Sequence, residues 1–439
     1  MPEPGALFSD IRLAGRRSLI AAVSGGGDSL ALLLLLHDYL KCLPERPSLV
    51  AVTVDHGLRS ESAAEARAVG ELAAARGIAH RTLRWEGAKP ASGISVAARE
   101  ARFSLLAHAA RQAGTDMVLT AHTADDQAET VAMRSSRGQG RGTAGIAPAT
   151  LYDGDVWFLR PLLQARRATL RAFLRERDIG WFEDPSNRDA RFERARVRLS
   201  LDEARTQLLL GEARDAQRRR EEEGRSAAHL IRNYAQQPVP GLLRFSLQAA
   251  SDPEAGLYTF RILLAAAGGA SHLPDEERSA EILRHVLADG RRASLSRVIM
   301  TRKGDWLYLH RELRNLPEKP LVRELVWDGR YRISTESPEP DTRIAPFGTV
   351  NAAALDLPAA DTPTHLLLSA QAAEPSAWVG DQCVGLAQQM KGIALRPLAA
   401  PWAKLLPSFD LAPAAALLGL MHGEPPPALP FDGHKGHNE

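Results

Sequence analysis

The sequence has little cysteine and no long apolar run. Two of its 439 residues are cysteines, Cys42 and Cys383, and they lie far apart in the chain. This excludes a CxxC metal or iron–sulfur motif and a disulfide framework, and it fits a reducing cytoplasm. The apolar segments 19–23 and 30–36 are separated by a polar loop, so neither is long enough to span a membrane. The N-terminus has no apolar core of signal-peptide length, and we expect a cytoplasmic protein without membrane contact.

The net charge is also small, at +2, but it is unevenly distributed along the chain. Between Arg134 and Arg198 there are 14 arginines, no lysine and 8 acidic residues. Such an excess predicts a local basic face of the kind that contacts nucleic acid. The length predicts about three domains, and the hydrophobic content of 44% is typical of a globular protein.

A glycine-rich stretch near the N-terminus lies between an apolar, β-prone segment and a strong helix former. Its residues are Ser24, Gly25, Gly26, Gly27, Asp28 and Ser29. Glycines allow a backbone to approach a bulky ligand closely, and the free N–H groups of a helix start favour an anion such as phosphate. The stretch lacks the lysine of GxxxxGK[ST] and the third glycine of GxGxxG. Asp28 therefore predicts a Mg²⁺ ion between its carboxylate and phosphate oxygens, and a tight turn capped by Ser24 is the alternative.

Strand and helix patterns alternate over the first part of the chain. The expected strands are short and mostly apolar, and they cover 18–23, 48–55, 78–85 and 116–122. Expected helices begin near Leu30, Ser60, Ser95 and Thr123. This alternation predicts an α/β fold with a doubly wound parallel sheet, in which ligands bind at the carboxyl ends of the strands. The glycine-rich stretch, Asp55, His56 and His122 all lie at those ends.

Two carboxylates of the helix that follows Thr123 form a second candidate site. Asp126 and Glu129 are three residues apart, so they share one face of the helix and point towards the same spot. Two such carboxylates repel each other unless they hold a cation or an ammonium group. The alternative is a capping box, in which Thr123 and Asp126 only stabilise the helix start.

The remaining chain predicts helices and a few strands without a catalytic motif. Residues 134–146 are basic and glycine-rich, and we expect a mobile loop that could grip phosphate backbone. A helix over 166–178 precedes a turn at Pro185, Ser186 and Asn187. Further expected elements are a long exposed helix over 199–235, helices near 253–267 and 276–288 ended by Gly290, two strands across Lys303-Gly304, short strands at ELVWDG, YRIST and THLLLSA, and a disordered tail from Gly423.

Six segments of the first two hundred residues resemble a known family. In order they are SGGGDS, VDHGLR, TAHTADDQAET, RGQGRGTAGI, RPLL and EDPSN. The first resembles the loop of the N-type ATP pyrophosphatases, or PP-loop superfamily, and the set resembles bacterial tRNA(Ile)-lysidine synthetases. The family usually has Arg-Asn-x-Ile-Arg after the last segment, whereas here Ala195 replaces the Asn between Arg194 and Arg198. The resemblance, which is weak beyond Arg198, implies an adenine nucleotide alpha hydrolase-like catalytic domain over 1–214. The rest of the chain has no catalytic motif, and we expect a mainly helical tRNA-binding domain over 215–321 and a mixed α+β accessory domain over 322–439.

The resemblance also implies a reaction and its ligands. ATP and Mg²⁺ would bind to residues 24–29 with Asp55 and His56, and Asp28 would hold the metal. The wobble cytidine of an isoleucine tRNA with a CAU anticodon would be adenylated and then attacked by free L-lysine. The family's lysine and reacting groups are bound by the acids that match Asp126, Glu129 and Asp55 and by the arginine that matches Arg102. Candidates for contacts with tRNA phosphates are Arg137, Arg141, Arg194 and Arg198, and a second copy of the chain, as a homodimer, is a further candidate partner.

Two other functions fit parts of this pattern. A tRNA thiolase of the same superfamily commonly uses paired cysteines or a cluster, which two distant cysteines do not supply. An inactive tRNA-binding protein of the same fold would have no need of Asp28, Ser29, Asp126 and Glu129. The sequence therefore favours an ATP-dependent ligase that forms a carbon–nitrogen bond on tRNA.

Overall fold

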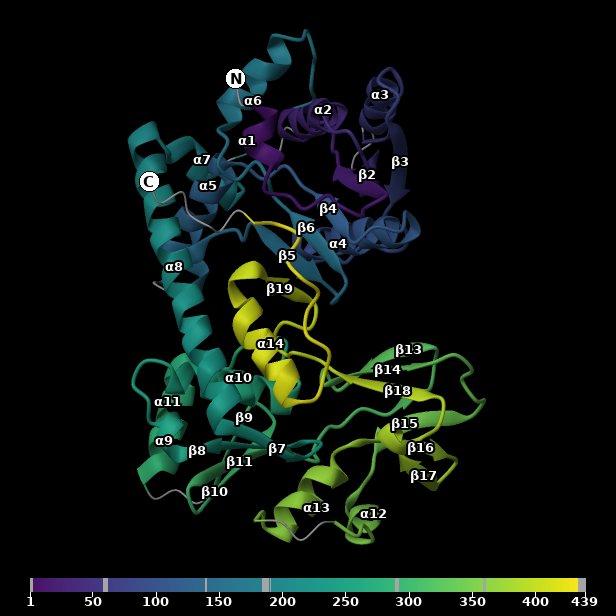
Figure 1. Ribbon diagram of the computed structural model, residues 1–439, viewed down its shortest axis with the longest axis vertical. Helices are drawn as coiled ribbons and strands as arrows, with labels where there is room; N and C mark the ends of the chain where they lie inside the picture. Colours follow the sequence, from purple (N-terminus) through teal and green to yellow (C-terminus); the bar gives the residue numbers. More distant parts are fainter. Residues whose placement is uncertain are drawn as a thin grey trace. The chain divides into compact units, whose positions relative to one another are not determined.

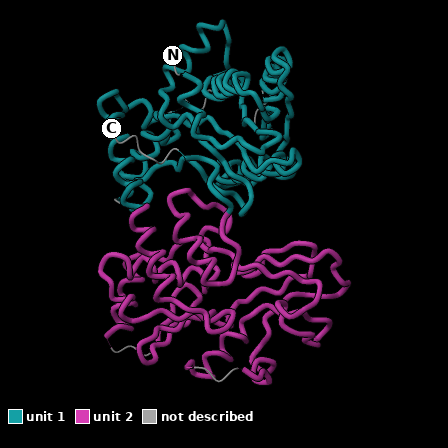
Figure 2. Tube along the Cα trace, viewed as in Figure 1, with its two compact units in different colours: residues 1–220, 427–439 teal, residues 221–426 magenta. Residues whose placement is uncertain are grey.

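The computed structural model describes residues 3–57, 62–138, 140–183, 189, 191–288, 292–357 and 361–432. The chain forms two compact units, residues 1–220 with 427–439, and residues 221–426 (Figure 2). The expected cap Ser60, the turn at 185–187 and the helix end Gly290 lie outside the described residues. In the described ranges, no helix combines the length and the apolar character needed to cross a membrane.

The first unit begins with a short helix and then alternates strands and helices. Its elements are α1 (Pro4–Phe8), β1 (Ser18–Ala22), α2 (Gly27–Lys41), β2 (Ser48–Asp55), α3 (Ser62–Ala74), β3 (Ala79–Arg84), α4 (Ile94–Gln112), β4 (Met117–Leu119), α5 (Ala124–Ser135), the 3-10 helix η1 (Arg141–Ala144), β5 (Ala149–Tyr152), β6 (Val156–Leu159), α6 (Arg167–Arg175) and α7 (Glu193–Ser200). The long helix α8 (Glu203–Tyr234) begins in this unit and ends in the second.

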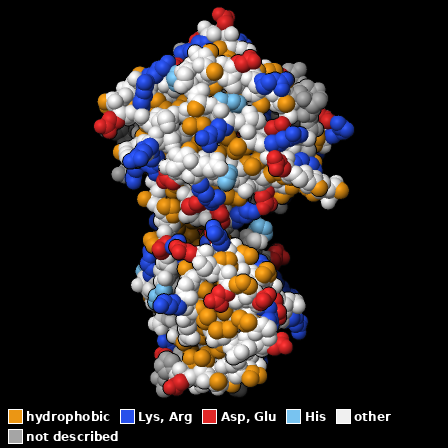
Figure 3. Space-filling model, turned by 90° about the vertical axis from the view of Figure 1, so that its right-hand side faces the viewer, with side chains coloured by type: hydrophobic (Ala, Val, Ile, Leu, Met, Phe, Trp, Pro, Cys, Tyr) orange, Lys and Arg blue, Asp and Glu red, His pale blue; other side chains and the backbone are white. Residues whose placement is uncertain are grey.

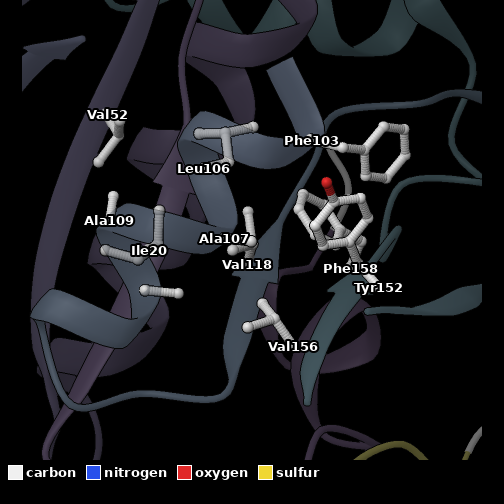
Figure 4. Close-up of a cluster of buried hydrophobic side chains, with 11 residues drawn as sticks. Ile20, Val52, Phe103, Leu106, Ala107, Ala109, Val118, Tyr152, Val156 and Phe158 are labelled. Atoms are coloured by element: carbon white, nitrogen blue, oxygen red, sulfur yellow. The ribbon is translucent and has the colours of Figure 1, made fainter. Parts of the chain in front are cut away.

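The strands of the first unit form a mostly parallel sheet in the order β5-β6-β4-β1-β2-β3. Helices α2 and α3 cover one face and α4 covers the other (Figure 1). Apolar side chains from five strands and from α4 meet in a buried cluster, which includes Ile20, Val52, Leu106, Val118 and Phe158 (Figure 4). The central strands β1 and β4 are almost fully buried, which explains their apolar sequences, whereas β3 at the edge of the sheet is mostly exposed and less apolar. The predicted doubly wound α/β fold is confirmed.

Two parts of the first unit were not predicted. β5 and β6 form an antiparallel hairpin, so the sheet is mixed at this end. Their turn contains Asp153 and Gly154, both with positive φ, and an Asp-Gly pair between apolar segments is a recognised hairpin signal. The helix α7 is a separate element of eight residues, although the sequence pattern favoured one long helix from 199 onwards.

The second unit contains smaller antiparallel sheets and helices. Its elements are β7 (Ala235–Val239), β8 (Leu242–Ser246), α9 (Leu247–Ala250), α10 (Gly256–Gly268), α11 (Glu276–Ala288), β9 (Arg292–Leu295), β10 (Val298–Lys303), β11 (Trp306–Arg311), β12 (Lys319–Pro320), β13 (Glu324–Trp327), β14 (Tyr331–Thr335), β15 (Thr342–Pro346), α12 (Thr349–Ala353), α13 (Thr364–Ala372), β16 (Pro375–Val379), β17 (Gln382–Leu386), β18 (Ile393–Pro397), β19 (Leu405–Pro407) and α14 (Leu411–Leu420). The hairpin across Lys303-Gly304 is confirmed, with Gly304 at positive φ. It belongs to the sheet β7-β8-β11-β10-β9.

Two C-terminal predictions differ from the structure. The segment THLLLSA was expected to be a strand but forms α13, because Leu366, Leu367 and Ala370 are buried together at helical spacing against β8 and β11. The tail was expected to be disordered from Gly423, but Phe431 forms an antiparallel bridge with Ile11. Residues 433–439 lie outside the described ones.

A buried group of charges lies in the second unit. Asp328 accepts hydrogen bonds from Arg311 (Nε to Oδ2, 3.0 Å), Arg330 (Nε to Oδ2, 2.9 Å) and Arg297 (Nη1 to Oδ1, 3.2 Å). Arg330 also donates to Glu374 at 2.6 Å, and the Tyr331 hydroxyl donates to the same carboxylate at 2.5 Å. We call these six residues the Asp328 cluster.

Candidate active site

The glycine-rich loop connects β1 to α2 and contains one glycine in the left-handed region of backbone conformation. Gly25 has φ +81°, and its carbonyl accepts a hydrogen bond from the N–H of Phe182 at 3.0 Å. Gly26 is the N-cap residue of α2 and has extended backbone angles, so the expectation that Ser24 caps the helix is wrong. No side chain caps α2, and its first N–H groups are therefore available to an anion.

Aromatic residues lie directly on this loop. A Cβ atom added to Gly27 would approach the Trp181 ring to 3.3 Å, and one added to Gly25 would approach the Phe182 ring to 3.1 Å. Both aromatic residues come from the segment after α6, which the sequence assigned only to a turn. The loop therefore requires glycine at these positions partly because protein packs against it and not solely because a ligand must approach.

Asp28 lies in the first turn of α2 and has one satisfied and one unsatisfied oxygen. Its Oδ2 accepts a hydrogen bond from Arg167 Nε at 3.1 Å, whereas its Oδ1 is buried without a partner. Burial raises the pKa of Asp28, although the nearby Arg167 charge acts in the opposite direction. An unpartnered buried carboxylate oxygen is a suitable ligand for a hard cation.

The structure contains both the cap and the paired acids expected at α5. Thr123 is the N-cap, its Oγ1 accepts from the Asp126 N–H, and its own N–H donates to Asp126 Oδ2 at 2.8 Å. The other oxygen of Asp126 points to the same guanidinium groups as Glu129. The capping box and a candidate site are therefore compatible, because each uses a different oxygen of one carboxylate.

Three arginines surround these two acids. Arg167 donates to Asp126 Oδ1 (2.9 Å) and to Glu129 Oε1 (3.2 Å). Arg194 donates to Asp126 Oδ1 (2.8 Å) and to Glu129 Oε2 (2.7 Å). Arg198 donates to Glu129 Oε1 at 2.7 Å, and the Glu129 side chain is only 2% exposed. We call these five residues together with Asp28 the Glu129 cluster.

Arg167 and its neighbours were missed by the sequence reasoning. Asp125 accepts hydrogen bonds from Arg166 (3.1 Å) and from the backbone N–H of Arg167 (2.7 Å), which fixes the start of α6 beside α5. Arg166 also donates to Glu203 at 2.6 Å. The only available signal was the arginine pair after the RPLL segment, and nothing local shows which acids it meets.

A histidine and an arginine face each other at the end of β2. Arg102 donates to His56 Nε2 at 3.2 Å, so the proton of this neutral imidazole is on Nδ1, which is buried without a partner. Burial, reinforced by the Arg102 charge, lowers the pKa of His56 to about 4. Asp55 accepts from Ser62 Oγ at 2.7 Å and from the Gly57 N–H at 2.8 Å. The structure thus brings Arg102 to His56 at this strand end.

The basic loop after α5 is held by hydrogen bonds in its described part. Arg134 Nη1 donates to the carbonyls of Gly142 (2.9 Å) and Gly145 (2.7 Å). The Ile146 N–H donates to Gln127 Oε1 at 2.6 Å. These bonds connect the described part of the loop to α5. The expectation of a mobile loop did not foresee such anchoring.

The arginine excess between 134 and 198 is partly neutralised by acids from elsewhere in the first unit. Arg166, Arg167 and Arg177 form ion pairs with acids outside that segment, namely with Asp125, Asp28 and Asp38. Arg137 pairs with Glu193, and the Arg141 carbonyl accepts from Arg220 at 3.1 Å. On the face drawn in Figure 3, Lys and Arg side chains are interspersed with acidic and hydrophobic ones. Local composition therefore overestimates the basic surface.

Comparisons with known proteins match the first part of the chain to a PP-loop domain and nearly the whole chain to tRNA(Ile)-lysidine synthases. A family model described as a PP-loop domain matches residues 5–204. The tRNA(Ile)-lysidine synthase of Mesorhizobium japonicum is 46% identical over 98% of this chain and 97% of its own length. That of Brucella ovis is 40% identical over 75% of this chain and 77% of its own length. Among solved structures, a U34-tRNA thiolase, NcsA from Methanococcus maripaludis, covers 49% of this chain and 77% of its own at 17% identity and a TM-score of 0.43.

Proposed function

The chain belongs to the tRNA(Ile)-lysidine synthase family, and from this premise we propose that it joins free lysine to the wobble cytidine of an isoleucine tRNA with a CAU anticodon. Its PP-loop domain implies that ATP is bound. The enzyme is then a ligase that forms a carbon–nitrogen bond with release of pyrophosphate and AMP.

The observation that carries this proposal is the Glu129 cluster. One guanidinium, that of Arg167, lies within hydrogen-bond distance of Asp28 in the glycine-rich loop and of Asp126 and Glu129 on α5. A nucleotide on the loop and an amino acid on the α5 acids would therefore be neighbours. A two-step ligation requires this proximity, because the second nucleophile must reach the activated base.

The reaction divides one difficult substitution into two easier ones. In the first step the ring carbonyl oxygen of the cytidine attacks the α-phosphate of ATP, and the bond to the β-phosphate breaks with pyrophosphate as leaving group. In the second step the lysine amine attacks the ring carbon that bears the adenylated oxygen, that C–O bond breaks, AMP leaves, and the nitrogen loses its extra proton. AMP is a far better leaving group than an unactivated carbonyl oxygen. The wobble base lies in a single-stranded loop, so it can enter a pocket without unpairing a duplex.

We assign the ATP to residues 24–29 and to the end of β2. The uncapped N–H groups of α2 would bind phosphate oxygens. The nucleoside part would bind to the Nδ1–H of His56, which has no partner, and to the Asp55 carboxylate, whose Oδ1 already accepts from Ser62 and from the Gly57 N–H. Mg²⁺ would bind to Asp28 Oδ1 and, in the manner usual for this ion, to phosphates and water, and it would supply charge neutralisation.

We assign the lysine to α5 and the tRNA to the arginines. Free lysine carries two ammonium groups and one carboxylate. Asp126 and Glu129 would bind its ammonium groups, and Arg102 would bind its carboxylate. Arg137 and Arg141 remain candidates for tRNA phosphates. Arg194 and Arg198 remain candidates as well, but they contact the two acids in the free protein, and phosphate would have to compete for them.

We also keep the division of labour between 1–214, which would carry the chemistry, 215–321, which would bind tRNA, and the accessory region 322–439. The test of the function is mass spectrometry of nucleosides from an unmodified isoleucine tRNA incubated with the protein, ATP, Mg²⁺ and lysine. We expect a lysidine that appears only when both ATP and lysine are present. A thiolated base formed with a sulfur donor would instead support a thiolase, and unmodified tRNA that is nevertheless bound would support an inactive binding protein.

A further inference from the structure

Arg167 is placed between the two halves of the proposed site. In the described part of the first unit, its guanidinium is the one that contacts both the glycine-rich loop and the acids of α5. Its Nε donates to Asp28, its Nη2 to Asp126 and its Nη1 to Glu129, at 3.1, 2.9 and 3.2 Å. All three nitrogens of the group are therefore used, each by a different carboxylate.

The backbone of Arg167 is held independently of its side chain. Its N–H donates to Asp125 Oδ2 at 2.7 Å, and the adjacent Arg166 also donates to Asp125. Because α6 begins at this anchored residue, the long side chain can change partners without movement of the helix. The other two arginines differ, since Arg194 and Arg198 contact α5 acids and not Asp28.

The acids of α5 have no vacant place for an ammonium group while Arg167 is present. Asp126 Oδ1 accepts from Arg167 and Arg194, and Asp126 Oδ2 is used by the helix cap. Each oxygen of Glu129 also accepts from two guanidinium groups. Three cations already face these two acids, so an added ammonium would be a fourth positive charge in a partly buried space, which is unfavourable. An ammonium that replaces the Arg167 guanidinium leaves the number of charges unchanged.

A polyphosphate on the glycine-rich loop supplies the reason for such an exchange. Asp28 and Arg167 are in direct contact, so a phosphate bound beside Asp28 comes within reach of the guanidinium. Arginine binds phosphate oxygens in charge-assisted hydrogen bonds at least as well as it binds carboxylates. A cation on Asp28 Oδ1 would at the same time repel the guanidinium from Asp28.

We propose that Arg167 couples ATP binding to lysine binding: in the free protein its guanidinium occupies the position of the lysine ammonium between Asp126 and Glu129, and a nucleotide on the loop draws it away. The inference rests on the proposed lysine site. It makes Arg167 a positioning residue that gives the two substrates a preferred order, with nucleotide first. Because such coupling is reciprocal, lysine also tightens nucleotide binding by the same factor.

The test measures lysine affinity without tRNA, on the full chain, by equilibrium dialysis of labelled lysine. It is carried out with and without saturating Mg²⁺ and α,β-methylene ATP, an analogue whose α–β bond is not cleaved. For the wild type we expect the nucleotide to lower the lysine Kd by about five- to fifty-fold. For Arg167→Gln we expect a ratio near one, with a lysine Kd in the absence of nucleotide that is lower than that of the wild type.

Arg194→Gln is the matched control, because it removes a guanidinium from the same two acids and leaves the contact with Asp28 intact. It should keep the nucleotide dependence, and Arg167→Lys, with one donor group in place of three, should keep part of it. A merely structural role for Arg167 would change the Kd values without removing the ratio.

A wild-type ratio of one overturns the inference, and so does loss of the ratio in both glutamine variants. Absence of lysine binding even with the nucleotide bound overturns it as well. The lysidine assay separates these outcomes from the proposed function: lysidine formed by a protein with a ratio of one leaves the function standing, and no lysidine at all removes both. If Arg167→Gln does not fold, Arg167→Lys takes its place, and an undiminished wild-type ratio in that variant overturns the inference.

Discussion

The two units of this chain each bury a carboxylate among three arginines, and the two clusters differ in how completely they are satisfied. In the Asp328 cluster, Arg311 is fully buried and donates to Asp328 and to the carbonyl of Glu312 at 2.6 Å. Glu374, the second acid, is held by Arg330 and by the Tyr331 hydroxyl. Each acid of this cluster therefore has several donors, and all of them come from the fold itself.

The Glu129 cluster also consists of carboxylates and guanidinium groups, but one of its carboxylate oxygens has no hydrogen-bond donor. Asp28 Oδ1 has no partner. The exposure of the arginines does not separate the two clusters, because Arg194 of this cluster and Arg297 of the other are 42% and 41% exposed. A cluster in which every carboxylate has donors stabilises a fold or costs it little, whereas an unsatisfied buried oxygen is suited to a ligand. The number of charges is thus a poor guide to function, and the unsatisfied atom is a better one.

The largest expected effect is on activity, and it comes from substitution of Asp28, the residue whose unsatisfied oxygen distinguishes the Glu129 cluster from the Asp328 cluster. Asp28→Ala should reduce pyrophosphate release at least about 100-fold, because it removes the proposed metal ligand and charge stabilisation at the phosphates. The measurement is pyrophosphate release with ATP and unmodified tRNA, and thermal unfolding controls for the fold. Near-normal release by a folded variant would remove Asp28 from the reaction.

In the second unit, the corresponding change should affect stability and leave the chemistry intact. Asp328→Asn leaves three guanidinium groups around an uncharged amide, and we expect a loss of about 3–5 kcal/mol in the free energy of unfolding of this unit. Urea unfolding measures it, and Glu281→Gln, at an exposed ion pair with Arg278, is a control that should change little. ATP binding should persist under native conditions. If Asp328→Asn were harmless, the Asp328 cluster would not be structural.

A truncation tests whether the second unit adds tRNA affinity. A chain that ends after Arg220 keeps the hydrogen bonds of Gln217 and Arg220 to the carbonyls of Ala144 and Arg141. It should retain ATP binding and lose about 100-fold in tRNA affinity at fixed salt, because one of two linked contact regions is absent. Unchanged tRNA affinity would show that residues 1–220 suffice, without the part of the first unit that comes from 427–439.

Substitutions on α5 test the amino-acid half of the site. Asp126→Asn and Glu129→Gln should each raise the lysine KM about ten- to a hundred-fold, because a charge-assisted hydrogen bond to the ammonium is lost. The change in ATP affinity should be much smaller, since the proposed phosphate site lies on a separate element, the glycine-rich loop. Incorporation of labelled lysine at varied concentration measures the first quantity. A wild-type lysine dependence in both variants would reduce these residues to a helix cap and a structural ion pair.

The smallest expected effect is a change in the pH dependence of stability, and it concerns the buried side chain of His122. Burial lowers the pKa of His122 well below its ordinary value of 6.5, and the charges of Arg160 and Arg99 lower it further. As the pH falls below 6.5, the unfolded chain takes up a proton that the folded chain does not, so the free energy of unfolding decreases. His122→Asn should reduce this decrease by less than about 1.4 kcal/mol per pH unit. Parallel slopes for wild type and variant between pH 4 and pH 7 would contradict it.

Much of the fold of the first unit could be predicted because its signals are local. The apolar strands, the glycine-rich turn and the Thr123 cap are each defined within a few residues, and they follow from backbone geometry and periodic burial. The α5 acids could be found for the same reason, since helical spacing alone places Asp126 and Glu129 on one face. The hairpin of β5 and β6 was missed although its Asp-Gly turn was visible, and the THLLLSA segment was misread because a short apolar run does not distinguish strand from helix.

The sequence by itself determined the glycine-rich turn, the paired acids and the family resemblance, because these depend on spacing along the chain. The tertiary structure decided how the charges are paired: Arg167 meets Asp28 from 139 residues away, and Arg198 meets Glu129 from 69 residues away. Such pairs depend on which helices are neighbours around the sheet. Electrostatic attraction acts through space, so the sequence around one charged residue does not show which distant residue it will pair with. For the same reason only the folded chain distinguishes a site with an unsatisfied oxygen from a cluster that merely stabilises the fold.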